Sequence, residues 1–196
     1  CGAEGETTGD MVFNTAMTGY HEIPTDPSYA GQVIVMTYPL IGNYGVPEED
    51  AESHKAWPEA FVVKEMSSIP SSFRSSTPLP EWLRENGIVA IEDLDTRLLT
   101  KLTRSEGSLR CVVSTVDDDA DSLIAKARAA QPTEGQDLAS KVSCKEPYTW
   151  EAGYDASYPD WIDPAKTPRR VVAYDFGIKR NILRSLIHCG FEVTVV

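Results

Sequence analysis

The sequence is poor in basic residues and in long apolar runs. Its 196 residues include 18 lysines and arginines against 30 aspartates and glutamates, a formal charge of -12. This excess of negative charge repels phosphate backbones and anionic lipid surfaces, so nucleic acid is not an expected partner. No apolar run approaches the ~18 residues that a membrane-spanning helix requires, so no membrane association is expected either.

Cysteines are also few, and they lie far apart at Cys1, Cys111, Cys144 and Cys189. No C-x-x-C pair occurs, which argues against a zinc site and against a compact disulfide framework. A reducing cytoplasm is the expected compartment. Cys111 lies in a predicted strand, and Cys189 ends a predicted helix, where the helix dipole disfavours an anion, so neither is expected to act as a nucleophile.

The first two thirds of the chain alternate between strand and helix patterns. Runs rich in β-branched and aromatic residues, bounded by turn residues, predict strands over 11–17, 32–38, 61–66, 88–91 and 109–115. Capping residues and apolar periodicity predict helices over 79–86, 96–107 and 119–130. The middle helix is expected to be amphipathic, with an apolar face formed by Leu94, Leu98, Leu99 and Leu102.

The last third contains a break followed by a new pattern. Residues 132–168 hold five prolines and isolated aromatics such as Trp150, Tyr158 and Trp161, and they are predicted to form a connector that lies against a surface. Residues 169–196 then read as strand, helix and strand, with both strands apolar as in a parallel sheet. One βαβ unit cannot cover both of its faces, so this domain is expected to be truncated.

Three features of this sequence have a plainer explanation than the chemistry they suggest. Asp175-Phe176-Gly177 matches the magnesium-binding triplet of protein kinases, but neither H-R-D nor G-x-G-x-x-G accompanies it. Gly177 alone leaves open a nucleotide-binding α/β domain, but a tight strand-to-helix turn is the favoured explanation. His21, Glu22 and Asp26 share one loop without metal-ligand spacing and are expected to form a surface cluster.

Ser28 is the most interesting hydroxyl because it follows Asp26-Pro27 at the apex of the loop between the first two predicted strands. A hydroxyl there can donate or accept a hydrogen bond toward a ligand. No base neighbours it in sequence, so it is a weak candidate nucleophile. The residues alone favour a turn role over a ligand contact.

A series of ordered motifs points to a family. Residues 13–20 (FNTAMTGY), 25–29 (TDPSY), 37–39 (TYP) and 41–45 (IGNYG), then 87–91 (GIVAI), 95–97 (DTR) and 171–182 (VVAYDFGIKRNI), resemble the carbamoyl-phosphate synthetase small subunit. The resemblance covers nearly the whole chain, and matches of this length are far more specific than a short motif.

The resemblance implies an α/β fold in two parts. Residues 1–131 would form a swivelling β/β/α domain, 132–168 a connector, and 169–196 the first βαβ unit of a truncated doubly wound, flavodoxin-like glutamine amidotransferase domain. It implies hydrolysis of glutamine and delivery of ammonia to a large subunit, which binds ATP and Mg and makes carbamoyl phosphate from bicarbonate for arginine and pyrimidine biosynthesis.

Only one site residue carries over from the resemblance. Ser28, in the D-P-S-Y motif, would contact bound glutamine. The catalytic cysteine, histidine and acidic residue of the family have no counterpart here, because no G-x-C-x-G-x-Q motif occurs in this sequence. The alternative is therefore a non-catalytic interaction module that docks the large subunit.

Overall fold

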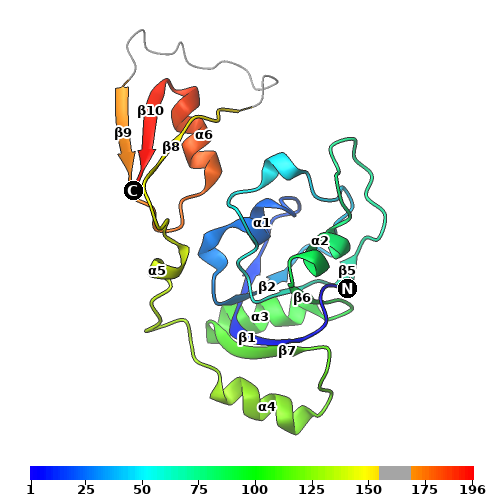
Figure 1. The fold of residues 1–196 in the computed structure, drawn as a ribbon. Coiled ribbons are helices and arrows are strands. Elements are labelled where there is room, and N and C mark those ends of the chain that lie inside the picture. The colour runs from blue at the N-terminus through cyan, green and yellow to red at the C-terminus, as the bar shows by residue number, and fades with distance from the viewer. Residues whose placement is uncertain (155–168) are drawn as a thin grey trace. The chain divides into compact units, whose positions relative to one another are not determined.

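The computed structural model describes residues 1–154 and 169–196, and the chain divides into two compact units, Cys1–Gln136 and Asp137–Val196 (Figure 1). Among the described residues, none of the helices combines the length and the apolar character that crossing a membrane demands.

The first unit is built on a mixed, mostly parallel sheet of five strands in the order β6-β4-β2-β1-β7 (Figure 1). Its strands are β1 (Glu6–Asn14), β2 (Gln32–Met36), β4 (Ala60–Val62), β6 (Val89–Ile91) and β7 (Leu109–Ser114). Only β7 is antiparallel to its neighbour, β1. The predicted strand over 61–66 is split, because its second half forms β5 (Glu65–Met66) and pairs with β3 (Leu40–Ile41) in a separate small sheet.

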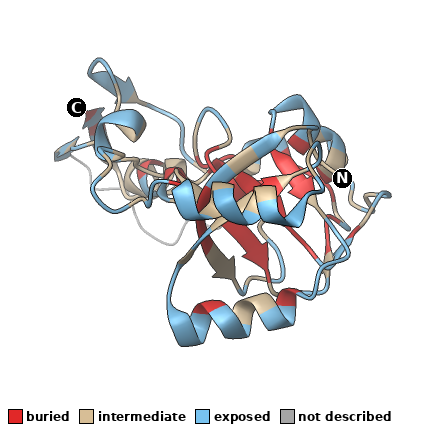
Figure 2. Ribbon diagram, turned by 90° about the horizontal axis from the view of Figure 1, so that it is seen from below, coloured by how far each residue is buried: buried red, intermediate tan, exposed pale blue. Residues whose placement is uncertain are grey.

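Both faces of the five-stranded sheet are buried, and successive residues of β2 alternate between them. Ile34 and Met36 belong to one apolar cluster, whereas Val33 and Val35 belong to the other. This alternation explains why β2 is apolar throughout. Helix α2 (Leu79–Glu85) buries two leucines in the first cluster, and buried residues follow these central strands in Figure 2.

Helix α3 (Thr96–Glu106) is present as predicted, but its predicted apolar face is wrong. Only Leu99 packs against the core, whereas Leu94, Leu98 and Leu102 are 36%, 60% and 40% exposed. The buried positions are Thr96 and Thr103. A threonine can be buried on a helix because its hydroxyl bonds to a carbonyl one turn earlier, as Thr103 Oγ1 does to the Leu99 oxygen at 3.0 Å.

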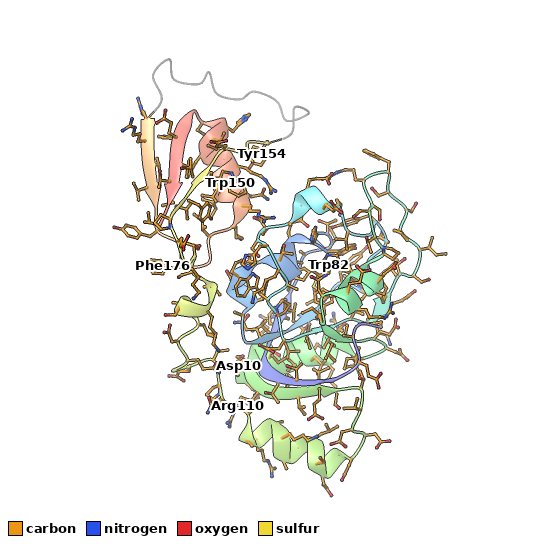
Figure 3. The ribbon with its side chains drawn as sticks, viewed as in Figure 1. Asp10, Trp82, Arg110, Trp150, Tyr154 and Phe176 are labelled. Carbon is orange, nitrogen blue, oxygen red and sulfur yellow. The ribbon has the colours of Figure 1, made fainter. Side chains whose placement is uncertain are left out.

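The first unit extends a few residues beyond its predicted end at residue 131. After helix α4 (Ala120–Ala129), the buried Asp10 carboxylate of β1 accepts hydrogen bonds from the Thr133 amide at 2.8 Å and the Thr133 hydroxyl at 2.5 Å. Arg110 of β7 donates to the carbonyls of Arg128 and Ala130 (Figure 3). These bonds attach the segment after α4 to the sheet.

The second unit contains the predicted βαβ arrangement. Strands β9 (Arg169–Ala173) and β10 (Phe191–Val195) pair in parallel, and helix α6 (Arg180–His188) lies between them in the chain. Leu183 of this helix is buried with Val193 and Val195.

Part of the predicted connector belongs to this second unit instead. Helix α5 (Ala139–Val142) and strand β8 (Tyr148–Trp150) precede β9, and β8 pairs antiparallel with β10. Trp150 packs against the buried cluster, and the Tyr154 hydroxyl lies 2.6 Å from Ser185 Oγ of α6 (Figure 3). The remainder of the predicted connector, residues 155–168 with Tyr158 and Trp161, lies outside the described residues.

Candidate functional site

The candidate site is the segment between β1 and β2, which the sequence predicted as an irregular loop over 18–31. The structure places two short helices in it, α1 (Glu22–Thr25) and the 3-10 helix η1 (Pro27–Tyr29). Gly19 and Gly31, near its two ends, have φ angles of 94° and 78°. Glycine adopts this left-handed region without a steric penalty, so the sharp turns are encoded locally.

Thr25 anchors this loop from within. It is 2% exposed, and its hydroxyl donates to the His21 carbonyl at 2.5 Å while accepting from the Glu52 amide at 2.9 Å. Ser53 Oγ donates to the Thr25 carbonyl at 2.5 Å, and Trp57 Nε1 donates to Ser53 Oγ at 2.7 Å. One threonine therefore ties the loop to a segment almost thirty residues further along the chain.

A stacked pair of tyrosines holds the beginning of the loop. The rings of Tyr20 and Tyr44 lie 4.2 Å apart between centroids, and the Tyr44 hydroxyl accepts hydrogen bonds from the amides of Gly19 and Tyr20. The Tyr20 hydroxyl donates to Asn43 Oδ1 at 2.9 Å. Burial raises the pKa of Tyr20 to about 12 and also raises the pKa of Tyr44, so both remain neutral hydrogen-bonding groups.

Ser28 is the exposed residue of this otherwise anchored turn. Its amide donates to Asp26 Oδ1 at 2.9 Å, Pro27 before it is buried, and the Tyr29 hydroxyl after it accepts from Asn14 Nδ2 at 2.8 Å. The Ser28 hydroxyl makes no hydrogen bond within residues 1–154 and 169–196. The backbone is therefore fixed while the hydroxyl remains able to bond a ligand.

The expectation of a surface cluster at His21, Glu22 and Asp26 is wrong. His21 is 5% exposed, and its Nδ1 lies 2.5 Å from the Pro47 carbonyl oxygen. Its ring packs edge-on against that of Trp82, which is labelled in Figure 3, with 5.0 Å between the ring centroids. Burial raises the pKa of Glu22, whose buried Oε2 has no hydrogen-bond partner in the part of the chain that the structure describes. Within the described part of the chain, no three histidines, cysteines or acidic residues gather as metal ligands would.

Comparison with known proteins identifies the family. The family model for the carbamoyl-phosphate synthase small chain, CPSase domain, matches residues 1–113, which include the five strands of the main sheet except the last residue of β7. The chain belongs to the carbamoyl-phosphate synthase small-chain family.

Relatives named carbamoyl phosphate synthase small chain match the whole sequence. The protein of Syntrophotalea carbinolica is 50% identical over 196 residues, covering 100% of this chain and 52% of the relative. The protein of Nitratidesulfovibrio vulgaris strain Hildenborough is 48% identical over 98% of this chain and 52% of the relative, and that of Aquifex aeolicus is 48% identical over 100% and 53%. The chain spans about half the length of the curated relatives it matches.

In this member of the small-chain family, the amides around Gly177 already have a partner. Asp175 Oδ1 accepts from the Gly177 amide at 2.8 Å and the Ile178 amide at 2.9 Å, while its Oδ2 accepts from the Cys144 amide at 2.8 Å. A bound phosphate would need these same amides. Asp175 thus organises the turn before α6, and this contact argues against the nucleotide-binding alternative.

Two of the thiols are poorly suited to nucleophilic catalysis. Burial, with a smaller contribution from Asp10, raises the pKa of Cys111 to about 11. Burial and Asp175 raise the pKa of Cys144. A thiol nucleophile requires the opposite shift, because the thiolate is the reactive form.

Proposed function

We propose that this chain is part of the glutamine-hydrolysing small subunit of carbamoyl-phosphate synthetase. In this role the whole subunit releases ammonia from glutamine and supplies it for the synthesis of carbamoyl phosphate. The observation that carries the proposal is the 50% identity along the entire chain to a carbamoyl phosphate synthase small chain. The nucleophile of this glutaminase would lie outside this sequence.

The proposal extends to architecture and to a partner. The first unit would be a swivelling β/β/α domain, and β9, α6 and β10 would open a flavodoxin-like amidotransferase domain, in keeping with their parallel pairing. The partner would be a large subunit that binds ATP and Mg, in a cytoplasmic heterodimer serving arginine and pyrimidine biosynthesis. A chain that only docks this large subunit is the alternative.

Ser28 would contribute a contact to bound glutamine. Its exposed hydroxyl has no competing hydrogen bond within the described residues, and the surrounding loop is held by Thr25, Tyr20 and Tyr44. A ligand would therefore bind to a turn that is already ordered, which lowers the entropic cost of binding. One neutral hydrogen bond contributes about 1 kcal/mol.

Reconstitution tests the activity. The full-length protein combined with a large subunit should make carbamoyl phosphate from glutamine, bicarbonate and ATP, whereas the present 196 residues alone should release no ammonia from glutamine. Failure of the full-length pair with glutamine would refute the proposal. Ammonia release by the 196-residue chain would instead remove the docking-only alternative and place a nucleophile within it.

Substitution of Ser28 tests the site. Ser28→Ala in the full-length subunit should raise the KM for glutamine about fivefold, the equivalent of one neutral hydrogen bond. Synthesis from ammonia should be unchanged, because ammonia does not need the glutamine contact. A glutamine KM equal to that of the unmodified protein would leave Ser28 with a turn role only.

A further inference from the structure

A cavity of about 670 Å³ opens beside the first turns of α3, where β2 and β4 end. Its lining includes four cationic side chains, Lys64, Arg97, Lys101 and Arg104, and three threonines, two of which, Thr96 and Thr100, belong to α3. The carboxyl ends of parallel strands are where ligands bind in many α/β sheets. A concentration of positive charge here is notable because the chain as a whole carries a formal charge of -12.

Three of the four cations lack a side-chain partner among the described residues. Lys64 pairs with Asp93 at 2.7 Å, but the side chains of Arg97, Lys101 and Arg104 make no ion pair or hydrogen bond to any residue that the structure describes. Their spacing along α3 places all three on one face of the helix. Like charges at this spacing repel and destabilise the helix unless an anion compensates them.

The hydroxyl groups and the single carboxylate of the lining are compatible with an anion. Thr96 is 4% exposed yet reaches the cavity, and its hydroxyl has no hydrogen-bond partner among the described residues. Asp95 also lines the cavity, but its Oδ1 accepts from the Leu98 amide at 2.9 Å and caps α3. The carboxylate is therefore directed in part toward the helix amides.

We propose that this cavity binds a small, multiply charged oxyanion of the phosphate class. Arginine presents a planar fork that matches phosphate oxygens, and two arginines with a lysine could surround one such group. The volume lies in the ordinary range for small-molecule sites, about 300–1,000 Å³. A concave site with a buried threonine favours a compact ligand over an extended acidic segment of a partner protein. The site uses no residue of the Ser28 loop.

Calorimetric titration with pyrophosphate tests the proposal on the full-length protein without its proposed large subunit. We expect saturable binding with a Kd below about 1 mM at low ionic strength, weakening as salt is added. The double variant Arg97→Gln and Lys101→Gln should bind at least about tenfold more weakly, because it removes two charge-assisted contacts. Arg84→Gln is the control for the loss of one positive charge elsewhere on the surface, since Arg84 is exposed on α2 and does not line the cavity.

Three outcomes would overturn the site. The first is a lack of saturable pyrophosphate binding, and the second is an affinity for pyrophosphate that the double variant leaves unchanged. The third is a loss of affinity in Arg84→Gln as large as that in the double variant, which would show that only the overall charge matters. A parallel titration with hexaglutamate distinguishes a small phosphate-class oxyanion from an acidic segment of a partner protein. If hexaglutamate bound more tightly than pyrophosphate and depended on Arg97 and Lys101, the surface would instead recognise an acidic protein segment. All variants are at exposed positions, so far-UV circular dichroism should confirm unchanged folding.

Discussion

The Ser28 loop and the α3 cavity are both candidate ligand-contacting regions of the first unit, and they are built in opposite ways. At the loop, Thr25, Tyr20 and the neighbouring Tyr44 use their hydroxyl groups in internal hydrogen bonds, whereas Ser28 presents its hydroxyl to solvent. At the cavity, by contrast, three cations on α3 have no partner among the described residues.

This difference separates two sources of binding energy. A pre-ordered loop favours affinity, because little conformational entropy is lost when the exposed Ser28 hydroxyl bonds a ligand. A row of uncompensated charges gains attraction at a distance but remains sensitive to salt. Substitutions within the loop should therefore change folding stability most, whereas substitutions at the cavity should change electrostatics.

Removing the loop anchor should produce the largest effect. Thr25→Val keeps the shape of the side chain but leaves the buried Glu52 amide without its acceptor. We expect the free energy of unfolding to fall by about 2 kcal/mol, the usual cost of an unsatisfied buried polar group. Urea unfolding measured by tryptophan fluorescence would check this, because Trp57 lies in the same hydrogen-bonded network.

Two control variants sharpen that comparison. Thr100→Val removes a hydroxyl whose one hydrogen bond among the described residues is to the Thr96 carbonyl within α3. Ser28→Ala removes a hydroxyl with no described partner. Both should shift the unfolding free energy by less than about 0.5 kcal/mol. A loss in either control as large as that in Thr25→Val would show that the loop is not specially anchored.

Glu22 should make the stability of the loop depend on pH. Burial raises the pKa of this carboxyl, with Asp50 and Glu52 adding repulsion, so the folded state holds the proton more tightly than the unfolded state. The folded state consequently loses stability as pH rises from the ordinary pKa through the raised one. Glu22→Gln should unfold at a higher temperature than the unmodified protein at pH 7. Its gain in the free energy of unfolding should be smaller than the loss in Thr25→Val.

The same variant should show no advantage at about pH 4, where the native carboxyl is protonated. Thermal unfolding monitored by circular dichroism across this range would measure the difference. If Glu22→Gln raised the unfolding temperature by the same amount at every pH, the stabilisation would come from packing and not from the removal of a buried charge.

Local patterns predicted most elements of the first unit, because capping and strand composition are local properties. The helix beginning at Thr96 and the Asp-Pro-Ser turn are examples. The anchoring of Thr25 by Glu52 could not be predicted, since it joins residues 27 positions apart. Strand β8 was missed for a similar reason, because three residues form a strand only when β10 provides the partner.

The face of α3 shows how a strong local signal can mislead. Counting leucines favoured Leu98 and Leu102 as core residues, whereas the structure buries Thr96 and Thr103. The row of cations at Arg97, Lys101 and Arg104 was visible in the sequence. Its proximity to the ends of β2 and β4 was not, because that depends on strand order.

The smallest expected effect concerns the charge row itself. Lys101 stands one helical turn from both Arg97 and Arg104, so Lys101→Gln removes two like-charge contacts while glutamine keeps a similar helix propensity. The variant should be more stable by about 0.5 kcal/mol at low salt, and the gain should vanish near 1 M salt as screening removes the repulsion. Urea unfolding at the two salt concentrations would measure this difference. A loss of stability at low salt would mean that Lys101 has a compensating partner. The contrast between the internally hydrogen-bonded Ser28 loop and the unpaired cations of α3 would then fail.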